Sequence, residues 1–224
     1  PDQIYTWSDA NKTTPKTSAP ALADAMELFR PYAEAGREIV CFSISAGMST
    51  SGNVMRLAAE ELGASDRIKV IDSANLSTGI GLLVIEAAIM AKNNRTASQI
   101  VSEIEKLKPN VRASFVVDTL TYLYRGGRCN AVAAMAGGVL KLHPRIVVED
   151  GAMNASKKYR GKIASVVMNY VKDMEKDLKK ARPERVFITH SGCEQETVEK
   201  VRAYLKELDI FDEILETRAG GVVS

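Results

Sequence analysis

Short apolar runs rich in β-branched residues alternate along the chain with stretches of helical hydrophobic periodicity. The runs predict strands at 37–44, 68–72, 113–118, 145–149, 185–190 and 211–217. Apolar positions at helical spacing run from Leu22 to Ala33, from Ile100 to Leu107, from Ile163 to Leu178 and from Val198 to Leu208. Alternating strands and helices are typical of α/β layers around a largely parallel sheet.

The pattern changes near residue 141. A helical segment ends there, because Pro144 disfavours helical backbone in the residue before it. Residues 145–158 then indicate a β-hairpin with Asp150-Gly151 in its turn. We therefore expect two α/β domains. The first covers 1–140 and has three layers and a mostly parallel sheet, and the second covers 141–224 and is an α+β domain with a mixed sheet.

Three further segments carry local signals. Thr96 and Gln99 form a capping box before the helix that contains Ile100. Residues 79–91 are apolar nearly all round, which predicts a buried helix. Residues 131–138 have unusually small side chains, which allow close approach of a ligand or of another backbone. Either of these last two segments could line an apolar tunnel, and tight helix packing explains the small residues equally well.

Hydroxyl and glycine residues fill 43–53, Ser-Ile-Ser-Ala-Gly-Met-Ser-Thr-Ser-Gly-Asn, between a predicted strand and the helical pattern that begins at Met55. Free backbone N–H groups and the helix dipole favour an anion at such a helix start. No Lys or Arg lies between Val40 and Met55, so the loop suits one carboxylate or phosphate better than a triphosphate. Simple capping by Ser49, Thr50 or Ser51 is the alternative explanation.

Composition narrows the classes of function. The chain has 224 residues, 46% of them hydrophobic, and 30 basic against 28 acidic residues give a net charge of +2. This balance gives no reason to expect nucleic acid or a membrane surface as the main partner. Three widely spaced cysteines form neither a disulfide framework nor a zinc pattern, so we expect no metal and a reducing, cytoplasmic setting. No apolar run approaches membrane-spanning length, and we expect no stable membrane insertion.

Two motif matches are incomplete. Gly79-Ile80-Gly81 begins like a dinucleotide fingerprint, but Val84 stands at the third glycine and six residues separate Asp72 from Gly79. Residues 47–51 resemble the Gly-x-Ser-x-Gly nucleophile elbow of hydrolases, but Ser51 stands at the position of the last glycine. A serine hydrolase that uses Ser49 stays an alternative, with only His143 and His190 as candidate bases. A sensor of small anions is a second alternative.

Four sequence segments, taken in their order along the chain, are more specific than a generic α/β pattern. They are Lys16-Thr17-Ser18-Ala19-Pro20, the loop 44–49, the pair 70–73 and 77–81, and the run 117–128 that ends in Arg125-Gly126-Gly127-Arg128. Their order and spacing resemble the DegV family of bacterial fatty-acid-binding proteins, the lipid-binding subunits of fatty acid kinase. The resemblance covers nearly the whole chain, and it implies a DegV-like pair of α/β domains that hold one long-chain fatty acid between them.

The resemblance also implies a function without bond chemistry. The protein would be a lipid-binding protein, not an enzyme, and would need no cofactor. It would present the carboxylate of its fatty acid to an ATP-dependent fatty acid kinase, which forms the acyl phosphate used in phospholipid synthesis. The fatty acid and the kinase would be its partners, with no nucleic acid among them, and we expect a monomer when it is free.

The family's carboxylate-binding threonine and serine match Thr17 and Ser49, and we expect the neighbouring Ser18, Thr50 and Ser51 to take part in binding the carboxylate. The family usually has Ser-Gly-Thr where this chain has Ser49-Thr50-Ser51, so Thr50 stands in the place of a glycine. Two further parts of the family pattern, its first strand and a loop with a third carboxylate-binding residue, a histidine, are expected outside the printed sequence.

The remaining candidates concern the acyl tail and the kinase. For the tail we expect a lining that includes Ala134, Gly137, Gly138, Ile80 and Leu83. For docking of the kinase we expect cations near the domain junction, namely Arg125, Arg128 and Arg160. Ordinary surface charge explains these arginines equally well.

Overall fold

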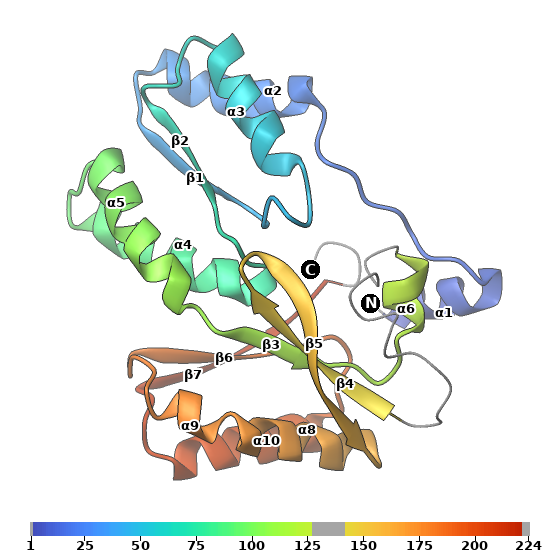
Figure 1. Cartoon of the computed structure of the whole chain (residues 1–224). Helices are drawn as coiled ribbons and strands as arrows, with labels where there is room; N and C mark the ends of the chain where they lie inside the picture. Colours follow the sequence, from blue (N-terminus) through green and yellow to red (C-terminus); the bar gives the residue numbers. More distant parts are fainter. Residues whose placement is uncertain (1, 127–141, 221–224) are drawn as a thin grey trace. The chain divides into compact units, whose positions relative to one another are not determined.

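The computed structural model describes residues 2–126 and 142–220, and their elements confirm a mixed α/β fold (Figure 1). The first half contains α1 (Asp2–Asn11), α2 (Leu22–Glu34), β1 (Ile39–Ser43), α3 (Ser51–Glu61), β2 (Ile68–Asp72), α4 (Ser77–Lys92), α5 (Ala97–Leu107) and η1 (Lys108–Asn110). The second half contains β3 (Ala113–Val116), α6 (Thr121–Arg125), β4 (Leu142–Glu149), β5 (Ala152–Arg160), α8 (Ile163–Asp173), α9 (Glu175–Leu178), β6 (Arg185–His190), α10 (Gln195–Glu207) and β7 (Glu213–Arg218).

The chain forms two compact units. Unit 1 contains residues 1–17, 114–147 and 154–224, and unit 2 contains residues 18–113 and 148–153. The tip of the β4–β5 hairpin therefore belongs to unit 2. The units divide the chain at other points than the predicted boundary between residues 140 and 141, and that domain boundary stays a prediction.

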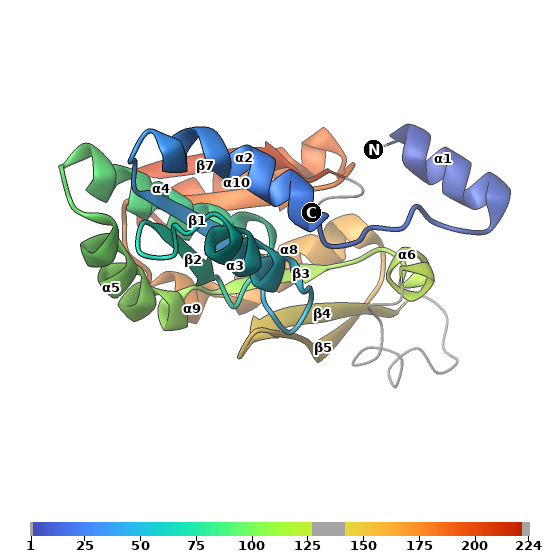
Figure 2. The same ribbon diagram turned by 90° about the horizontal axis from the view of Figure 1, so that it is seen from above.

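Unit 2 is built around the parallel pair of β1 and β2, in which Ile39 lies opposite Ile68 and Ser43 opposite Asp72. Alternate side chains of a strand point to opposite faces, so both faces of an apolar strand need a cover. On one face, Ile39, Cys41, Ile68 and Val70 pack with α2 and α3. On the other face, Val40, Phe42 and Ile71 pack with α4 and α5. The result is the three-layer arrangement expected from the sequence, and α2 and α3 lie side by side in both views (Figure 1, Figure 2).

Unit 1 has its own core. The strands β6 and β7 are parallel, with Arg185 opposite Glu213 and His190 opposite Arg218, and β3, β4 and β5 form a three-stranded sheet in that order. The helices α8 and α10 pack against each other and bury Val166, Tyr170, Val201 and Leu205 in one cluster with residues of β5, β6 and β7 (Figure 1). A mixed set of sheets under amphipathic helices agrees with the α+β pattern expected for this half of the chain.

Most predicted local signals are confirmed. The strand 68–72 has the predicted bounds, and Thr96 forms its capping box with Gln99. Asp150 and Gly151 form the hairpin turn with φ of 50° and 74°, the left-handed backbone that a two-residue hairpin turn requires.

One helix was not predicted, and two predictions about helices were wrong. The sequence pattern did not predict α1, because this helix has no apolar stripe and its one buried residue is Ser8. The segment 79–91 is not buried all round, since Val84 and Ile89 in α4 are each 41% exposed. The helix predicted from 163 to 178 is interrupted at Met174, so α8 ends at Asp173 and α9 follows.

Candidate functional site

The loop between β1 and α3 is organised around Ser45, whose side chain is 1% exposed. Its carbonyl oxygen accepts hydrogen bonds from the amides of Met48 and Ser49 at 2.9 and 3.1 Å. Its amide donates to the carbonyl oxygen of Asn75 at 2.9 Å. Ser45 is therefore the fixed point from which the polypeptide turns toward Ser49.

The hydroxyl of Ser45 joins this loop to the hairpin tip. It donates to the carbonyl oxygen of Gly151 across 2.6 Å and accepts from the amide of Gly47 across 3.2 Å. Neither glycine has room for a side chain. A Cβ on Gly47 would lie 2.9 Å from the Gly151 oxygen, and a Cβ on Gly151 would lie 2.7 Å from the Ser45 hydroxyl. Ser45 is one of the hydroxyl residues of the segment 43–53, but its hydroxyl is engaged within the protein.

Asp72 holds the same loop from the end of β2. One carboxylate oxygen accepts from the amide of Ala46 at 3.2 Å and from the amide of Ala74 at 2.9 Å. Asn75 follows, 4% exposed, and its side-chain oxygen accepts from the amide of Leu76. A Cβ on Gly79 would lie 2.0 Å from that oxygen. Close packing against Asn75 therefore explains why residue 79, which belongs to the incomplete dinucleotide motif, is glycine.

The start of α3 carries the candidate anion-binding hydroxyls. The hydroxyl groups of Ser49 and Ser51 lie 2.8 Å apart, and the Ser49 hydroxyl also accepts from the amide of Ser51 at 3.2 Å. Thr50 is the N-cap residue, but its side chain makes no capping hydrogen bond, so capping does not account for this hydroxyl. Its φ of −85° is open to any residue, so the geometry of the loop does not need the glycine usual in related sequences.

A buried hydroxyl lies beneath this helix start. Ser43 is 2% exposed, and within residues 2–126 and 142–220 its hydroxyl has no hydrogen-bond partner. A Cβ on Gly52 would lie 2.7 Å from that hydroxyl, so the helix approaches Ser43 closely because residue 52 is glycine. The first turn of α3 thus has hydroxyl groups in the preceding loop and a further hydroxyl, that of Ser43, beneath it. Residues 41–54 contain no Lys or Arg.

The two other hydroxyl candidates lie elsewhere in the chain. Thr17 and Ser18 are exposed in the segment between α1 and α2, and the division between the units falls between them. The structure therefore brings Ser49, Thr50 and Ser51 together at one helix start, whereas Thr17 belongs to unit 1.

The tail candidates differ in their surroundings. Leu83 is 1% exposed and packs into the core of unit 2 with Ile71, Ala87, Ile100 and Ile104. Ile80, one turn earlier in α4, is half-buried. Ala134, Gly137 and Gly138 lie outside the described residues.

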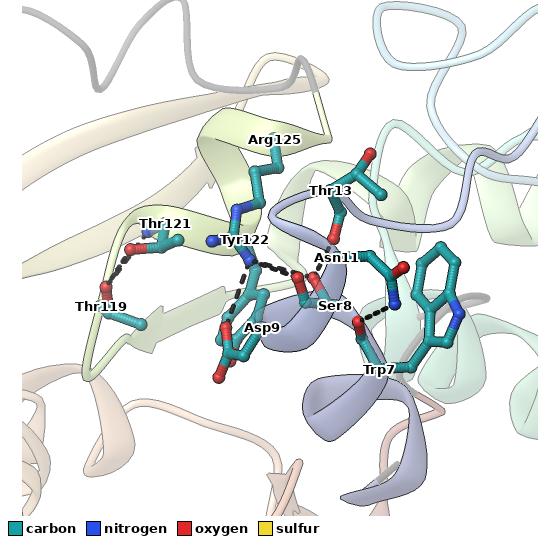
Figure 3. A network of polar contacts seen from close by, with 9 residues as sticks. All are labelled: Trp7, Ser8, Asp9, Asn11, Thr13, Thr119, Thr121, Tyr122 and Arg125. Atoms are coloured by element: carbon teal, nitrogen blue, oxygen red, sulfur yellow. Dashed lines mark hydrogen bonds and ion pairs between the residues drawn. The ribbon is translucent and has the colours of Figure 1, made fainter.

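The arginine candidates also differ. Arg125 ends α6, and its side chain is 18% exposed and bound to α1 (Figure 3). Arg160 is exposed at the end of β5. Arg128 lies outside the described residues.

The two candidate bases for a hydrolase differ, because both ring nitrogens of His143 are engaged, whereas the buried Nδ1 of His190 has no hydrogen-bond partner within residues 2–126 and 142–220. The two ring nitrogens of His143 each lie 3.1 Å from a carbonyl oxygen, of Val117 and of Gly161. The Nε2 atom of His190 lies 3.2 Å from Glu216 Oε1. The hydrogen-bond partners of the Ser49 hydroxyl are the hydroxyl and amide of Ser51.

Burial raises the pKa of the Cys41 thiol to about 11 and also raises that of Cys193, so neither thiol favours the reactive thiolate. No group of three metal-ligating side chains occurs in the part of the chain that the structure describes. Among those residues, no helix has the length and apolar character needed to cross a membrane.

Comparison with known proteins identifies the protein family to which the chain is related. The family model described as "Uncharacterised protein, DegV family" matches residues 1–224. The chain belongs to the DegV family. A DegV domain-containing protein of Deinococcus radiodurans is 30% identical over 223 residues, which cover 99% of this chain and 78% of that protein. Another from Clostridium acetobutylicum is 33% identical over 189 residues, covering 83% of this chain and 66% of that protein.

Solved DegV structures have the same fold. A fatty-acid-binding DegV protein of Thermus thermophilus superimposes with a TM-score of 0.86 at 24% identity, over 99% of this chain and 78% of its own. A stearic-acid-binding protein of Eubacterium ventriosum gives 0.77 at 27% identity, over 95% and 74% of the two chains. DegV of Bacillus subtilis, a fatty-acid-binding protein, gives 0.78 at 25% identity, over 99% and 78%.

Two features of the DegV chain were missed in its sequence. One is Ser8, which is fully buried although it lies in a polar helix. The other is the role of Gly151, which the sequence indicated as a turn residue only. No local pattern signals either feature, because their partners Arg125 and Ser45 are separated from them by 117 and 106 positions.

Proposed function

We propose that this DegV protein binds one long-chain fatty acid and holds its carboxylate with the hydroxyl groups of Thr17 and Ser49. The observation that carries the proposal is the start of α3, where Ser49, Thr50 and Ser51 gather in a loop without cations. The stearic-acid-binding protein of Eubacterium ventriosum and the fatty-acid-binding DegV of Bacillus subtilis support this choice of ligand.

The chemistry of a fatty acid fits such a site. Each buried methylene of the tail contributes about 0.8 kcal/mol, so the tail can supply most of the affinity. Neutral hydroxyl donors and the helix dipole then need only to orient the carboxylate. A carboxylate that is not paired with Lys or Arg also keeps its oxygen free to attack a phosphoryl donor.

The first experiment tests the ligand and the head-group residues. The purified protein is extracted with organic solvent, the extract is analysed by mass spectrometry, and the Kd for a long-chain fatty acid is measured. Ser49→Ala and Thr17→Ala each remove a hydrogen bond to a charged acceptor and should weaken binding by about 1.5–3 kcal/mol. Ser65→Ala, an exposed serine in the turn after α3, is the matched control, and Thr17→Ser should restore affinity.

Two results would contradict the assignment. One is an unchanged Kd in both alanine variants. The other is covalent labelling of Ser49 by a fluorophosphonate, which would indicate a nucleophilic serine and favour the hydrolase alternative.

We further propose that the bound carboxylate is presented to an ATP-dependent fatty acid kinase. The printed sequence contains no phosphate-binding P-loop, and in this proposal a separate kinase supplies the phosphoryl group. Arg160, together with Arg128, is the proposed docking cation. Arg160→Glu should slow acyl phosphate formation by an added kinase, mainly through slower association, and leave the Kd for fatty acid unchanged.

Lys176→Glu is the control for Arg160→Glu, because Lys176 is an exposed cation on α9 in the same unit. An equal kinase rate in the two charge-reversal variants would remove Arg160 from the docking surface. A loss of fatty-acid binding in Arg160→Glu would instead assign this arginine to the ligand site.

A further inference from the structure

A polar network fastens α1 to α6 immediately before the segment that carries Thr17 (Figure 3). At its centre is Ser8, the buried residue of α1, whose side chain is polar. The Nη1 group of Arg125 donates to the carbonyl oxygen and to the hydroxyl of Ser8, each at 3.1 Å, and to Asp9 at 3.2 Å. We call Ser8, Asp9 and Arg125, with the contacts described next, the α1 clasp.

The clasp extends into the segment that follows α1. The amide of Thr13 donates to the carbonyl oxygen of Ser8 at 3.2 Å, and the Ser8 hydroxyl donates to the carbonyl oxygen of Thr13. Lys16 then donates from its Nζ to the carbonyl oxygen of Arg125 at 2.8 Å. The chain is thus held at Thr13 and again at Lys16, the residue directly before Thr17.

Aromatic contacts add to the clasp on the same face of α1. The Tyr122 hydroxyl donates to Asp9 at 2.9 Å, and this hydrogen bond raises the pKa of Tyr122. The rings of Tyr5 and Tyr122 lie 5.0 Å apart between centroids, and the Arg125 guanidinium lies 5.8 Å from the Tyr122 centroid. Trp7 is 48% exposed, and its carbonyl oxygen accepts from the side-chain amide of Asn11 within α1 (Figure 3).

We infer that Ser8 and Arg125 are positioning residues for Thr17. This inference rests on the proposed function, in which the Thr17 hydroxyl binds the carboxylate of a fatty acid. Thr17 lies in an extended segment without helix or strand hydrogen bonds, so its position depends on the anchors beside it. A hydroxyl that is held in place before the ligand arrives loses less conformational entropy on binding.

Arg125 therefore acts within unit 1. Its guanidinium is directed at Ser8 and Asp9, and its carbonyl oxygen receives Lys16. Each of these contacts joins α6 to α1 or to the segment after it. The charge of Arg125 is used to order the polypeptide around Thr17.

A double-mutant cycle tests the inference with a long-chain fatty acid as the probe. Ser8→Ala should weaken binding roughly three- to tenfold, the effect of one lost hydrogen bond. If Ser8 acts through Thr17, the same change should have less than a twofold effect, within about 0.4 kcal/mol, in a Thr17→Ala background. It should keep its full effect in a Ser49→Ala background. Thr6→Ala is the control, because the Thr6 hydroxyl donates within α1, to the carbonyl oxygen of Asp2.

A second measurement needs no ligand. Trypsin can cleave after Lys16, next to Thr17, and the exposed Lys92 at the end of α4 serves as a reference bond in the same reaction. Ser8→Ala and Arg125→Lys should each accelerate cleavage after Lys16 about tenfold relative to Lys92, because cleavage follows the population of the locally opened segment.

The outcomes separate the two proposals. Additive effects of Ser8→Ala and Thr17→Ala on the Kd, or unchanged cleavage after Lys16 in both clasp variants, would overturn the positioning role. If the unaltered protein binds no fatty acid, the proposed function fails, and the trypsin comparison still decides whether the clasp holds the Thr17 segment.

Discussion

The hydroxyl of Ser45 and the carbonyl oxygen of Gly151 form a 2.6 Å hydrogen bond between residues 106 positions apart. The bond fastens the loop that leads to Ser49 to the tip of the β4–β5 hairpin. Both partners are buried, so loss of the Ser45 hydroxyl would remove this donor from a buried carbonyl oxygen. The hairpin tip is therefore part of the support of the candidate anion site, although no candidate ligand residue lies in it.

Ser45→Ala should destabilise the protein by about 1–3 kcal/mol, because the Gly151 carbonyl and the Gly47 amide lose their buried partner. The measurement is the urea midpoint, with the exposed Ser102 on α5 changed to Ala as the control. We also expect weaker fatty-acid binding, since Ser49 depends on the turn around Ser45. A midpoint equal to that of the control would mean that water replaces the lost hydroxyl.

Gly151→Ala tests the close approach at the hairpin tip. Gly151 and Gly36 have similar left-handed backbones, with φ of 74° and 69°. A Cβ on Gly36 meets nothing within 4 Å, whereas one on Gly151 would lie 2.7 Å from the Ser45 hydroxyl. Gly36→Ala should therefore cost only the backbone strain of about 1–2 kcal/mol, and Gly151→Ala should cost more. Equal unfolding free energies for the two variants would show that the hairpin tip can move away from Ser45.

Leu83 and Ile80 separate core packing from tail binding. Leu83→Ala should lower the free energy of unfolding by about 2–5 kcal/mol, because it leaves a cavity in a closed cluster. Ile80 is half-buried, so Ile80→Ala should cost less stability and, if Ile80 lines the tail site, should change the preferred acyl chain length. The comparison needs unfolding curves and the Kd for two fatty acids of different length. An unchanged length preference would remove Ile80 from the tail lining.

Asp173 predicts a pH dependence of stability. Hydrogen bonds from Lys157 and Tyr159 hold the pKa of Asp173 below its usual value. A carboxylate with a lowered folded pKa stabilises the protein above its unfolded pKa, and this contribution disappears as the pH falls through the folded value. Asp173→Asn should cost about 1 kcal/mol at pH 7 after allowance for solvent screening. The difference from the unaltered protein should shrink below about pH 5.

Urea midpoints at pH 7 and at pH 3 measure this effect. Asp177→Asn, an exposed carboxylate on α9, is the control. A stability loss in Asp173→Asn that is equal at both pH values would show that shape, not charge, accounts for the contribution of Asp173.

The features of the fold that could be predicted depend on interactions between residues close together in the sequence. The alternation in β1, with Ile39 and Cys41 on one face and Val40 and Phe42 on the other, follows from the period of a strand. The capping box at Thr96 needs only residues 96–99, and the hairpin turn needs only Asp150 and Gly151. The hydroxyl cluster at 49–51 could likewise be predicted, because one helix start brings it together.

The features that could not be predicted depend on distant partners. The helix α1 has no apolar stripe, and its polar face is held by Arg125 and Tyr122. The exposure of Val84 and Ile89 depends on how completely neighbouring elements cover α4, which hydrophobic periodicity does not report. The Ser45 hydroxyl supports the loop through Gly151, which is 106 positions away. The local sequence therefore does not distinguish this supporting hydroxyl from the candidate ligand hydroxyl of Ser49.

Ser8 and Arg125 are 117 positions apart, so the ribosome synthesises these two partners at different times. A ribosome adds about 5–20 residues per second, so α1 emerges roughly ten seconds before its partner helix exists. Residues 18–113 carry the helices and strands of the layered unit 2 and can begin to collapse during that interval. A short helix without a continuous apolar stripe can remain in water for this time more readily than a strongly amphipathic one. The weak hydrophobic pattern of α1 thus suits a segment that is synthesised well before its partner helix and docks late.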